Sequence, residues 1–309
     1  MSRRKRPNTV HGWVLLDKPV GVTSTQAVGI AKRLFGTSKA GHAGTLDPLA
    51  SGMLPIALGE ATKTVPFVQD GRKVYRFTVR WGEETTTDDT EGTVVATSGT
   101  RPSTDEIDAV LGAFEGEISQ VPPAFSAIKI AGERAYDLAR AGEEVVLAPR
   151  PVTIHRLVLV EALDADTAVF ETECGKGAYV RALARDMGRR LGARGHVVAL
   201  RRLAVGPFGE ADMIPLENLE ELAHNGARDG ALAAALRPVE TALDDIPALA
   251  LTEADANRLR SGQPVLLRGR DAPAFHGPAY ATTRGRLVAL CEVSAGEIHP
   301  RRVFNLTAA

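Results

Sequence analysis

One aspartate stands out among the residues that could carry out chemistry. Asp47 lies between Leu46 and Pro48, within residues 41–52, a stretch that contains three glycines and one proline. An ionised carboxylate is able to attack the anomeric carbon of a sugar, and a glycine-rich loop could present it in a demanding backbone geometry. Aspartate before proline is also a common turn element. The loop by itself therefore leaves a nucleophile and a plain turn open.

A carboxylate nucleophile needs a cation beside it, because a neighbouring arginine favours the charged form and fixes its orientation. Arg181, near the start of an arginine-rich helix, is a candidate for this role. The alternative is that Lys176, Tyr179 and Arg181 belong to a solvated turn and helix face. Tyr75 points to the inner face of a predicted strand, where it could be a core residue or a platform for a ligand.

The motifs of several large enzyme classes are missing from the chain. It has no G-x-x-x-x-G-K-[ST], G-x-G-x-x-G, H-E-x-x-H or G-x-S-x-G. These motifs signal nucleotide hydrolysis, dinucleotide redox chemistry, zinc proteolysis and α/β-hydrolase chemistry. The two cysteines, Cys174 and Cys291, are too few for a disulfide framework and lack the spacing of a zinc site. We therefore expect a reaction with no cofactor and no metal, in the reducing cytoplasm.

The charges are sorted along the chain although the net charge is only -1. Residues 1–80 carry 13 Lys and Arg against 4 Asp and Glu, whereas residues 81–120 carry 1 against 10. Residues 176–202 hold 8 basic residues and only Asp186 as an acid. If the two basic regions meet in space they form an anion-binding face, and we expect the acidic segment to be turned away from it. Ordinary solvated surface is the alternative.

Composition indicates a soluble protein with a sizeable core. The 309 residues are 44% hydrophobic and 24% charged, with a mean hydropathy of -0.07, which excludes collagen-like, low-complexity and membrane classes. This length suggests one large and one small domain. The basic start is followed by an apolar run that ends at Asp17, so we expect no signal peptide and no membrane span. Residues 1–10 are predicted to be a flexible basic arm.

Hydrophobic spacing predicts the elements that must position these residues. The predicted strands cover residues 13–17, 74–81, 152–160, 168–174 and 196–204. The predicted helices cover residues 24–35, capped by Ser24, 103–114, with a capping box from Ser103 to Glu106, and 179–191, with two more within 216–243. Because strands and helices do not alternate regularly, the pattern indicates an α+β fold rather than a doubly wound sheet or a TIM barrel.

Two further regions differ from this pattern. Residues 121–150 show no clear period and are predicted to be an inserted arm. After a plausible boundary near Pro247, a helix at 253–260 and brief strands at 265–267 and 287–293 indicate a small β-rich module.

Residues 41–55, followed by residues 59–63, closely resemble the signature of the TruB family of tRNA pseudouridine synthases. Supporting motifs follow in the family's order at residues 17–24, 73–75, 121–140, 174–181 and 200–208. The resemblance covers residues 12–208, and the last third of the chain matches loosely.

The resemblance implies that the chain isomerises the T-loop uridine at tRNA position 55 by detaching the base from the ribose, turning it and rejoining it through carbon 5. Asp47 matches the catalytic nucleophile and Arg181 its ion-pair partner. Whether Asp47 attacks the ribose or assists an elimination is left open. The extruded base would stack on Tyr75, with Tyr179 and Leu200 lining the uridine pocket.

His42 matches the residue that fills the space the base leaves in the T-loop. The family pattern is not complete, because Phe125 stands where Tyr is common and Gly175 where Ser is usual. Ala178 and Ala204 each stand where Thr is usual, which could change hydrogen bonds in the pocket.

The fold implied by the resemblance is a mixed, mainly antiparallel central sheet with flanking helices, the pseudouridine synthase fold, plus a small PUA-like domain. Residues 11–246 would form the catalytic domain, 121–150 its RNA-gripping thumb and 247–309 the PUA-like domain. The expected partner is the T-arm and T-loop of tRNA, with no membrane, no obligatory protein partner and a monomeric state. The alternatives are an RNA-binding protein that folds tRNA and a guide-RNA-dependent synthase subunit.

Overall fold

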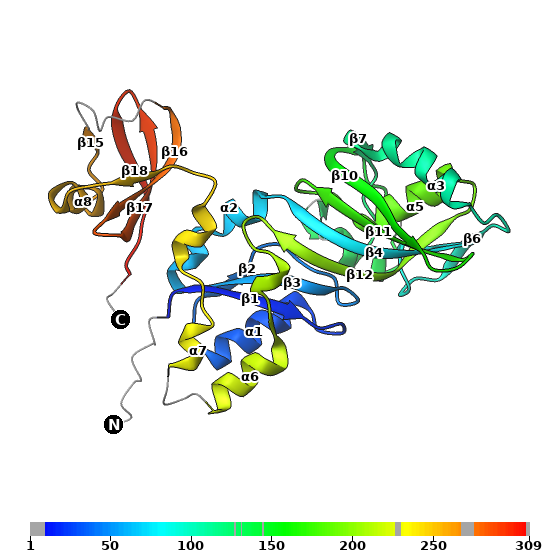
Figure 1. Cartoon of the computed structure of the whole chain (residues 1–309), viewed down its shortest axis with the longest axis horizontal. Coiled ribbons are helices and arrows are strands. Elements are labelled where there is room, and N and C mark those ends of the chain that lie inside the picture. Colours follow the sequence, from blue (N-terminus) through cyan, green and yellow to red (C-terminus); the bar gives the residue numbers. More distant parts are fainter. Residues whose placement is uncertain are drawn as a thin grey trace.

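The chain folds around two separate β-sheets, one large and one small (Figure 1). A computed structural model describes residues 10–126, 128–130, 132–143, 145–225, 230–266 and 275–306, without the side chains of residues 129, 130, 134, 137, 140 and 225. The predicted flexible arm at residues 1–10 lies, apart from Val10, outside the described residues.

The large sheet has nine strands in the order β13-β1-β3-β12-β4-β11-β10-β7, with β2 also paired to β3. Its strands are β1 (Gly12–Lys18), β2 (Ala40–His42), β3 (Ser51–Leu58), β4 (Lys73–Trp81), β7 (Gly116–Gln120), β10 (Arg150–Ala162), β11 (Thr167–Cys174), β12 (Gly195–Val205) and β13 (Ile214–Pro215). Within it β1 pairs with β13, and β3 with β12, in parallel. The other pairs are antiparallel. The predicted α+β fold with a mainly antiparallel central sheet is confirmed.

Helices flank this sheet. They are α1 (Ser24–Leu34), α2 (Val65–Asp70), α3 (Thr104–Leu111), α5 (Val180–Arg190), α6 (Leu216–Asn225) and α7 (Ala231–Ala234), with 3-10 turns η1 (Gly59–Lys63), η2 (Gly112–Phe114), η3 (Glu210–Asp212) and η4 (Val239–Leu243). The capping box at Ser103 is confirmed. The predicted cap at Ser24 is wrong by one residue, because Thr23 caps α1 and Ser24 is the first residue of the helix.

Strand β4 runs through the middle of the large sheet and shows the predicted alternation. Phe77 and Trp81 are buried on one face, whereas Arg76 and Arg80 on the other face are exposed. The buried face packs against the neighbouring strand, where the Phe77 and Phe170 ring centroids are 5.5 Å apart. Tyr75 shares this inner face but lies nearer the strand's start, so it is only half buried.

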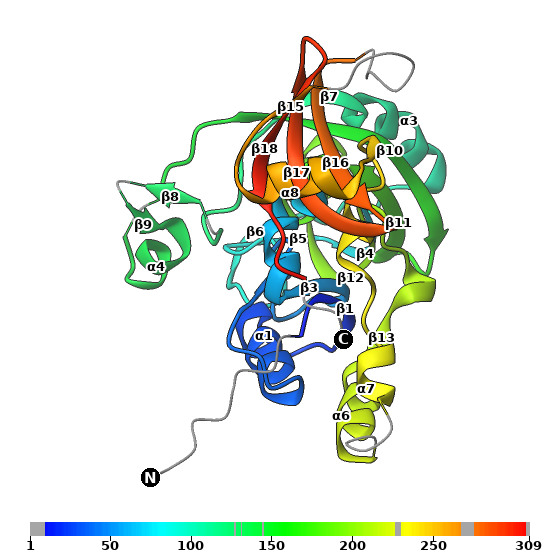
Figure 2. The ribbon, with the colours of Figure 1, turned by 90° about the vertical axis from the view of Figure 1, so that its left-hand side faces the viewer.

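The predicted arm leaves the large sheet at its edge. Gln120 ends β7 and pairs in register with Arg150, the first residue of β10. Between them lie β8 (Lys129–Ile130), β9 (Glu133–Arg134) and the short helix α4 (Ala135–Arg140), elements that the sequence did not predict. Figure 2 shows β8, β9 and α4 standing off from the body of the molecule.

The small sheet is formed by the end of the chain, in the order β14-β16-β17-β18-β15. Its elements are β14 (Ala248–Ala250), α8 (Glu253–Arg260), β15 (Val265–Leu266), β16 (Gly277–Thr283), β17 (Arg286–Ser294) and β18 (Glu297–Val303). Two further strands, β5 (Glu83–Thr85) and β6 (Val94–Thr97), form a separate hairpin. The sequence predicted α8, β15 and β17 but missed β14, β16 and β18. The PUA likeness and the domain limits stay predictions.

An apolar cluster joins the two sheets. Trp13 and Phe208, with ring centroids 5.5 Å apart, belong to the same buried cluster as Leu287, Leu290 and Phe304 from the end of the chain. The small sheet is thereby packed against the large one rather than tethered by a linker alone. No helix among the described residues has the length and apolar character needed to cross a bilayer.

Candidate active site

The loop between β2 and β3 carries Asp47, and its backbone is held from several sides. The Ser24 hydroxyl accepts a hydrogen bond from the Leu46 amide and donates to the Leu46 carbonyl, each at 2.9 Å. The fully buried Lys18 ammonium donates to the Pro48 carbonyl at 3.5 Å. Gly44 adopts a φ of 99°, a conformation that side chains beyond glycine rarely adopt. Asp47 is thus presented by a fixed loop.

A buried arginine donates hydrogen bonds to the backbone of the same loop. Arg202, 1% exposed, donates from Nε to the Met53 carbonyl at 2.7 Å and from its two terminal nitrogens to the Thr45 and Gly44 carbonyls at 3.2 Å each. In the described part of the chain it has no carboxylate within ion-pair distance. Its positive charge is therefore balanced by carbonyl dipoles and acts on the neighbouring pocket.

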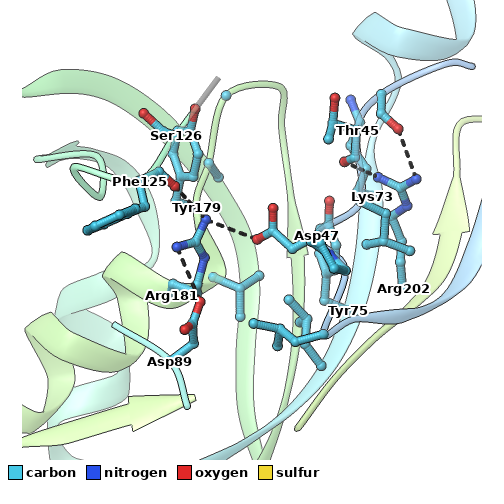
Figure 3. Close-up of a pocket in the computed structure, with 18 of the residues that line it drawn as sticks. Thr45, Asp47, Lys73, Tyr75, Asp89, Phe125, Ser126, Tyr179, Arg181 and Arg202 are labelled. Atoms are coloured by element: carbon cyan, nitrogen blue, oxygen red, sulfur yellow. Dashed lines mark hydrogen bonds and ion pairs between the residues drawn. The ribbon is translucent and has the colours of Figure 1, made fainter. Parts of the chain in front are cut away.

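Arg181 lies between two carboxylates (Figure 3). Its Nη2 is 3.0 Å from Asp47 Oδ2, and its Nη1 is 3.3 Å from Asp89 Oδ2. The same nitrogens donate to the Phe125 carbonyl at 2.9 Å and the Thr87 carbonyl at 2.8 Å. The expected pairing of Arg181 with Asp47 is present in the geometry.

The second carboxylate, Asp89, was not predicted from the sequence. It is 2% exposed, and its Oδ1 accepts from the Thr87 hydroxyl at 2.5 Å and the Glu91 amide at 2.9 Å. These bonds leave Oδ2 for Arg181. The signal that could have found it was a pair of acids, Asp88 and Asp89, facing a helix with arginines every four residues.

The expectation that the acidic segment is turned away from the basic one is wrong. Arg185 on α5 is 2.9 Å from Asp88, and Arg189 on the next turn is 2.5 Å from Glu84. Burial raises the pKa of Asp88 to about 6, although Arg185 opposes the shift. Desolvating an arginine costs free energy unless a carboxylate or other acceptor compensates. The carboxylates of the acidic segment therefore neutralise the arginines of α5 within the folded protein.

A cavity of about 620 Å³ opens above Asp47. Of the residues predicted from the sequence, it is lined by Asp47, Tyr75, Tyr179, Arg181 and Leu200. Its lining also includes Thr87, Asp89, Phe125, Ser126, Tyr136, Lys73, Lys176 and Arg202. The lining combines the rings of Tyr75, Phe125 and Tyr179 with the Asp47 carboxylate, a combination that suits a planar base attached to a sugar.

Two tyrosines and one histidine shape the electrostatics around this cavity. Burial raises the pKa of the Tyr75 and Tyr179 hydroxyls, so both are neutral at pH 7. Burial and the charge of Arg202 lower the pKa of His42. His42 lies at the end of β2, outside the cavity lining, and its Nδ1 has no hydrogen-bond partner among the described residues. The structure thus places five predicted residues on the cavity and His42 beside it.

Comparisons with known proteins decide the family. Residues 32–180 match the model of the TruB family pseudouridylate synthase N-terminal domain, and residues 181–244 match that of the tRNA pseudouridylate synthase B C-terminal domain. The tRNA pseudouridine synthase B of Bradyrhizobium diazoefficiens is 69% identical over 98% of this chain and 88% of its own length. The one from Agrobacterium fabrum is 58% identical over 98% and 97%. The chain belongs to the TruB family of pseudouridylate synthases.

Solved structures agree with this membership of the TruB family. The chain superposes with a TM-score of 0.75 on a chain of a Cbf5-Nop10-Gar1 complex, at 26% identity over 94% of this chain and 84% of that one. An archaeal box H/ACA sRNP Nop10-Cbf5 complex gives a TM-score of 0.73 at 26% identity, over 97% and 88%. The chain is therefore a pseudouridine synthase, an isomerase, with the pseudouridine synthase fold.

Proposed function

We propose that this synthase isomerises the T-loop uridine at position 55 of tRNA, as a monomer in the cytoplasm without a guide RNA. The observation that carries the proposal is the ion pair between Asp47 and Arg181, 3.0 Å long, in the lining of a cavity of about 620 Å³. The high identity to relatives named tRNA pseudouridine synthase B supports the choice of tRNA.

The reaction needs Asp47 as nucleophile. In our proposal the uridine leaves the T-loop stack, and an Asp47 carboxylate oxygen bonds to ribose C1' as the bond from C1' to base N1 breaks. Carbon 5 of the turned base then bonds to C1' and displaces the Asp47 carboxylate. The proton on carbon 5 is then lost to solvent and the freed N1 takes up one proton, so atoms and charge balance. No bond energy has to be imported, which agrees with the absence of nucleotide-hydrolysis and redox motifs.

Aromatic residues offset the cost of extruding the base. Taking a base out of its stack costs a few kcal/mol, and stacking on one aromatic ring returns about 1–3 kcal/mol. Tyr75 lines the cavity beside Asp47, and Tyr179 and Leu200 line the same cavity. We assign His42, next to the catalytic loop, to the space that the base vacates. Together these residues make extrusion nearly neutral in free energy.

The arm at residues 121–150 favours a stand-alone enzyme over the guide-dependent alternative. A synthase without a guide must grip its own substrate, and β8, β9 and α4 project from the body of the molecule where they could do so (Figure 2). The Cbf5 chains, which were solved in complexes with Nop10, are only 26% identical to this chain.

The deciding experiment is tritium release from a T-arm hairpin labelled at uridine carbon 5, with neither guide RNA nor metal added. The wild type should release tritium, and Asp47→Asn should release none while still binding the hairpin. Release by Asp47→Asn at the wild-type rate would refute the role of Asp47. Wild-type activity only with a guide RNA would favour the guide-dependent alternative, and binding without release would favour a folding protein.

A further inference from the structure

The root of the arm, residues 120–126, is tied to the helix that carries Arg181. Gln120 is 1% exposed and ends β7. Its Oε1 accepts a hydrogen bond from the Tyr179 amide at 2.8 Å, and its Nε2 donates to the Tyr179 carbonyl at 3.2 Å. One side-chain amide thus engages both backbone groups of the residue that caps α5.

This clamp lies at a helix start that has no ordinary side-chain cap. The first amide groups of a helix have no partner inside it and usually rely on a capping side chain. Tyr179 makes no side-chain cap bond to α5. Gln120 instead fixes the Tyr179 backbone, two residues before Arg181, and so sets where the helix begins.

Two more bonds join the arm root to α5. Arg181 Nη2 donates to the Phe125 carbonyl at 2.9 Å, and Arg185 Nη2 donates to the Val121 carbonyl at 2.8 Å. Both arginines are nearly buried. These bonds therefore fix the first residues of the arm and the first turns of α5 relative to each other.

Arg181 contacts both the arm root, at the Phe125 carbonyl, and the nucleophile Asp47. A guanidinium has two hydrogens on each terminal nitrogen. Nη2 donates to the Phe125 carbonyl and forms the ion pair with Asp47, whereas Nη1 donates to the Thr87 carbonyl and forms the ion pair with Asp89. If the Phe125 carbonyl moves, Nη2 loses one of the two contacts that aim it, and the buried Asp89 can draw the guanidinium away from Asp47.

We propose that Gln120 is a positioning residue for the isomerisation: it holds the arm root and the start of α5 together so that Arg181 is aimed at Asp47. This inference rests on the proposed function. It goes further, since the same contacts that orient the ion pair also anchor the RNA-gripping arm.

The test is the single-turnover rate of Gln120→Leu, which keeps the side chain's size and removes both hydrogen bonds. Misplacing a catalytic group by about 1 Å can cost about a hundredfold in rate. We expect the rate at saturating T-arm hairpin to fall about tenfold or more, while hairpin affinity changes by less than about twofold. Ile118→Ala, on the same strand, is the matched control: it loses packing in β7 but no bond to α5, and should keep the wild-type rate.

A second variant guards against simple misfolding. Gln120→Glu keeps an acceptor for the Tyr179 amide and, once protonated, also offers a donor to the Tyr179 carbonyl. Because burial raises the pKa of a carboxyl, its protonated fraction grows as the pH falls from 8 to 6. We expect its rate relative to wild type to rise over that range, a change that a packing defect alone would not produce.

The outcomes separate this inference from the proposed function. A wild type that releases no tritium defeats the proposed function. An active wild type together with a Gln120→Leu variant that folds and reacts at the wild-type rate overturns the positioning role. The role is equally overturned if Gln120→Leu loses only affinity, or if Ile118→Ala loses as much rate as Gln120→Leu.

Discussion

The hydroxyl of Ser24 bonds both backbone groups of Leu46, the residue directly before Asp47, at 2.9 Å each. Ser24 is buried in the first turn of α1, so a helix more than twenty positions earlier in the chain sets the path of the catalytic loop. Arg202 holds the same loop at Gly44 and Thr45. The nucleophile is therefore positioned by its neighbours' backbone rather than by contacts of its own side chain alone.

Ser24→Ala should lower the catalytic rate without weakening RNA binding. The change leaves the buried Leu46 amide and carbonyl without this partner, and an orphaned buried polar group costs about 1–3 kcal/mol. We expect the rate of tritium release at saturating RNA to fall about tenfold. Ser103→Ala, which removes the cap of α3 far from the cavity, is the matched control and should lower only the melting temperature. Equal rates for both variants would contradict the role of Ser24.

Arg181→Ala should reduce turnover far more than affinity. Its guanidinium faces Asp47 at 3.0 Å and is 6% exposed, so it is placed to orient the nucleophile rather than to hold a phosphate. We expect a loss of at least about a hundredfold in rate, of the size seen when a preorganised charged group is removed. Arg189→Ala, on the same helix but paired with Glu84, should be nearly as active as wild type. Equal loss of rate and affinity in Arg181→Ala would make it a phosphate clamp instead.

Local patterns in the sequence predicted much of the site. The glycine-rich loop made Asp47 a candidate, which the family resemblance then favoured over a plain turn, and strict alternation placed Tyr75 on the inner face of β4. Arg181 was a candidate because it began an arginine-rich helix. Each of these signals lies within about ten residues of chain.

Contacts between distant segments were not predictable in this way. Asp89 and Gln120 contact residues at the start of α5 that lie more than fifty positions later in the sequence. No local hydrophobic periodicity distinguishes either residue from its neighbours. The separate acidic and basic segments of the sequence suggested that the acidic residues lie away from the site. They lie beside α5 instead, because its buried arginines need carboxylates to offset the cost of desolvation. The missed strands β14, β16 and β18 are interrupted by small and polar residues, and pairing within the small sheet stabilises them: β16 and β18 flank β17, and β14 pairs with β16.

Stability should depend on pH through Lys18. Burial lowers the pKa of its ammonium from 10.5 to about 8, against the attraction of Asp47. Between pH 8 and 10.5 the unfolded chain binds more protons at this residue than the folded one, so its contribution to stability grows as the pH rises and is lost as the pH falls through 8. We expect the unfolding free energy of wild type minus that of Lys18→Met to rise by about 3 kcal/mol across that range. Urea titrations at pH 8 and 10.5 measure it, and a constant difference would show that Lys18 keeps its ordinary pKa when folded.

The motif at residues 59–63 should matter for docking of the small sheet. Lys63 Nζ donates to the Val303 carbonyl at 2.7 Å and to Glu60 at 2.5 Å, and Glu60 also accepts from the Asn305 amide at 2.8 Å. The Lys63 ammonium lies 5.7 Å from the centre of the Phe304 ring. The turn η1 thus holds the end of β18 through charge-assisted bonds.

Lys63→Met should therefore loosen the small sheet while the cavity stays intact. Losing these bonds costs about 2 kcal/mol, since hydrogen bonds to charged groups contribute about 1.5–3 kcal/mol each. We expect protease cleavage between the sheets to become faster. If full-length tRNA also contacts the small sheet, as we expect, activity on it should fall several-fold relative to activity on the T-arm hairpin. Lys39→Met is the matched control: Lys39 pairs with the same Glu60 at 3.8 Å and bonds to no described residue of the small sheet. If both variants cleave and react alike, the docking role of Lys63 is wrong, and the apolar cluster around Phe304 holds the sheets together without it.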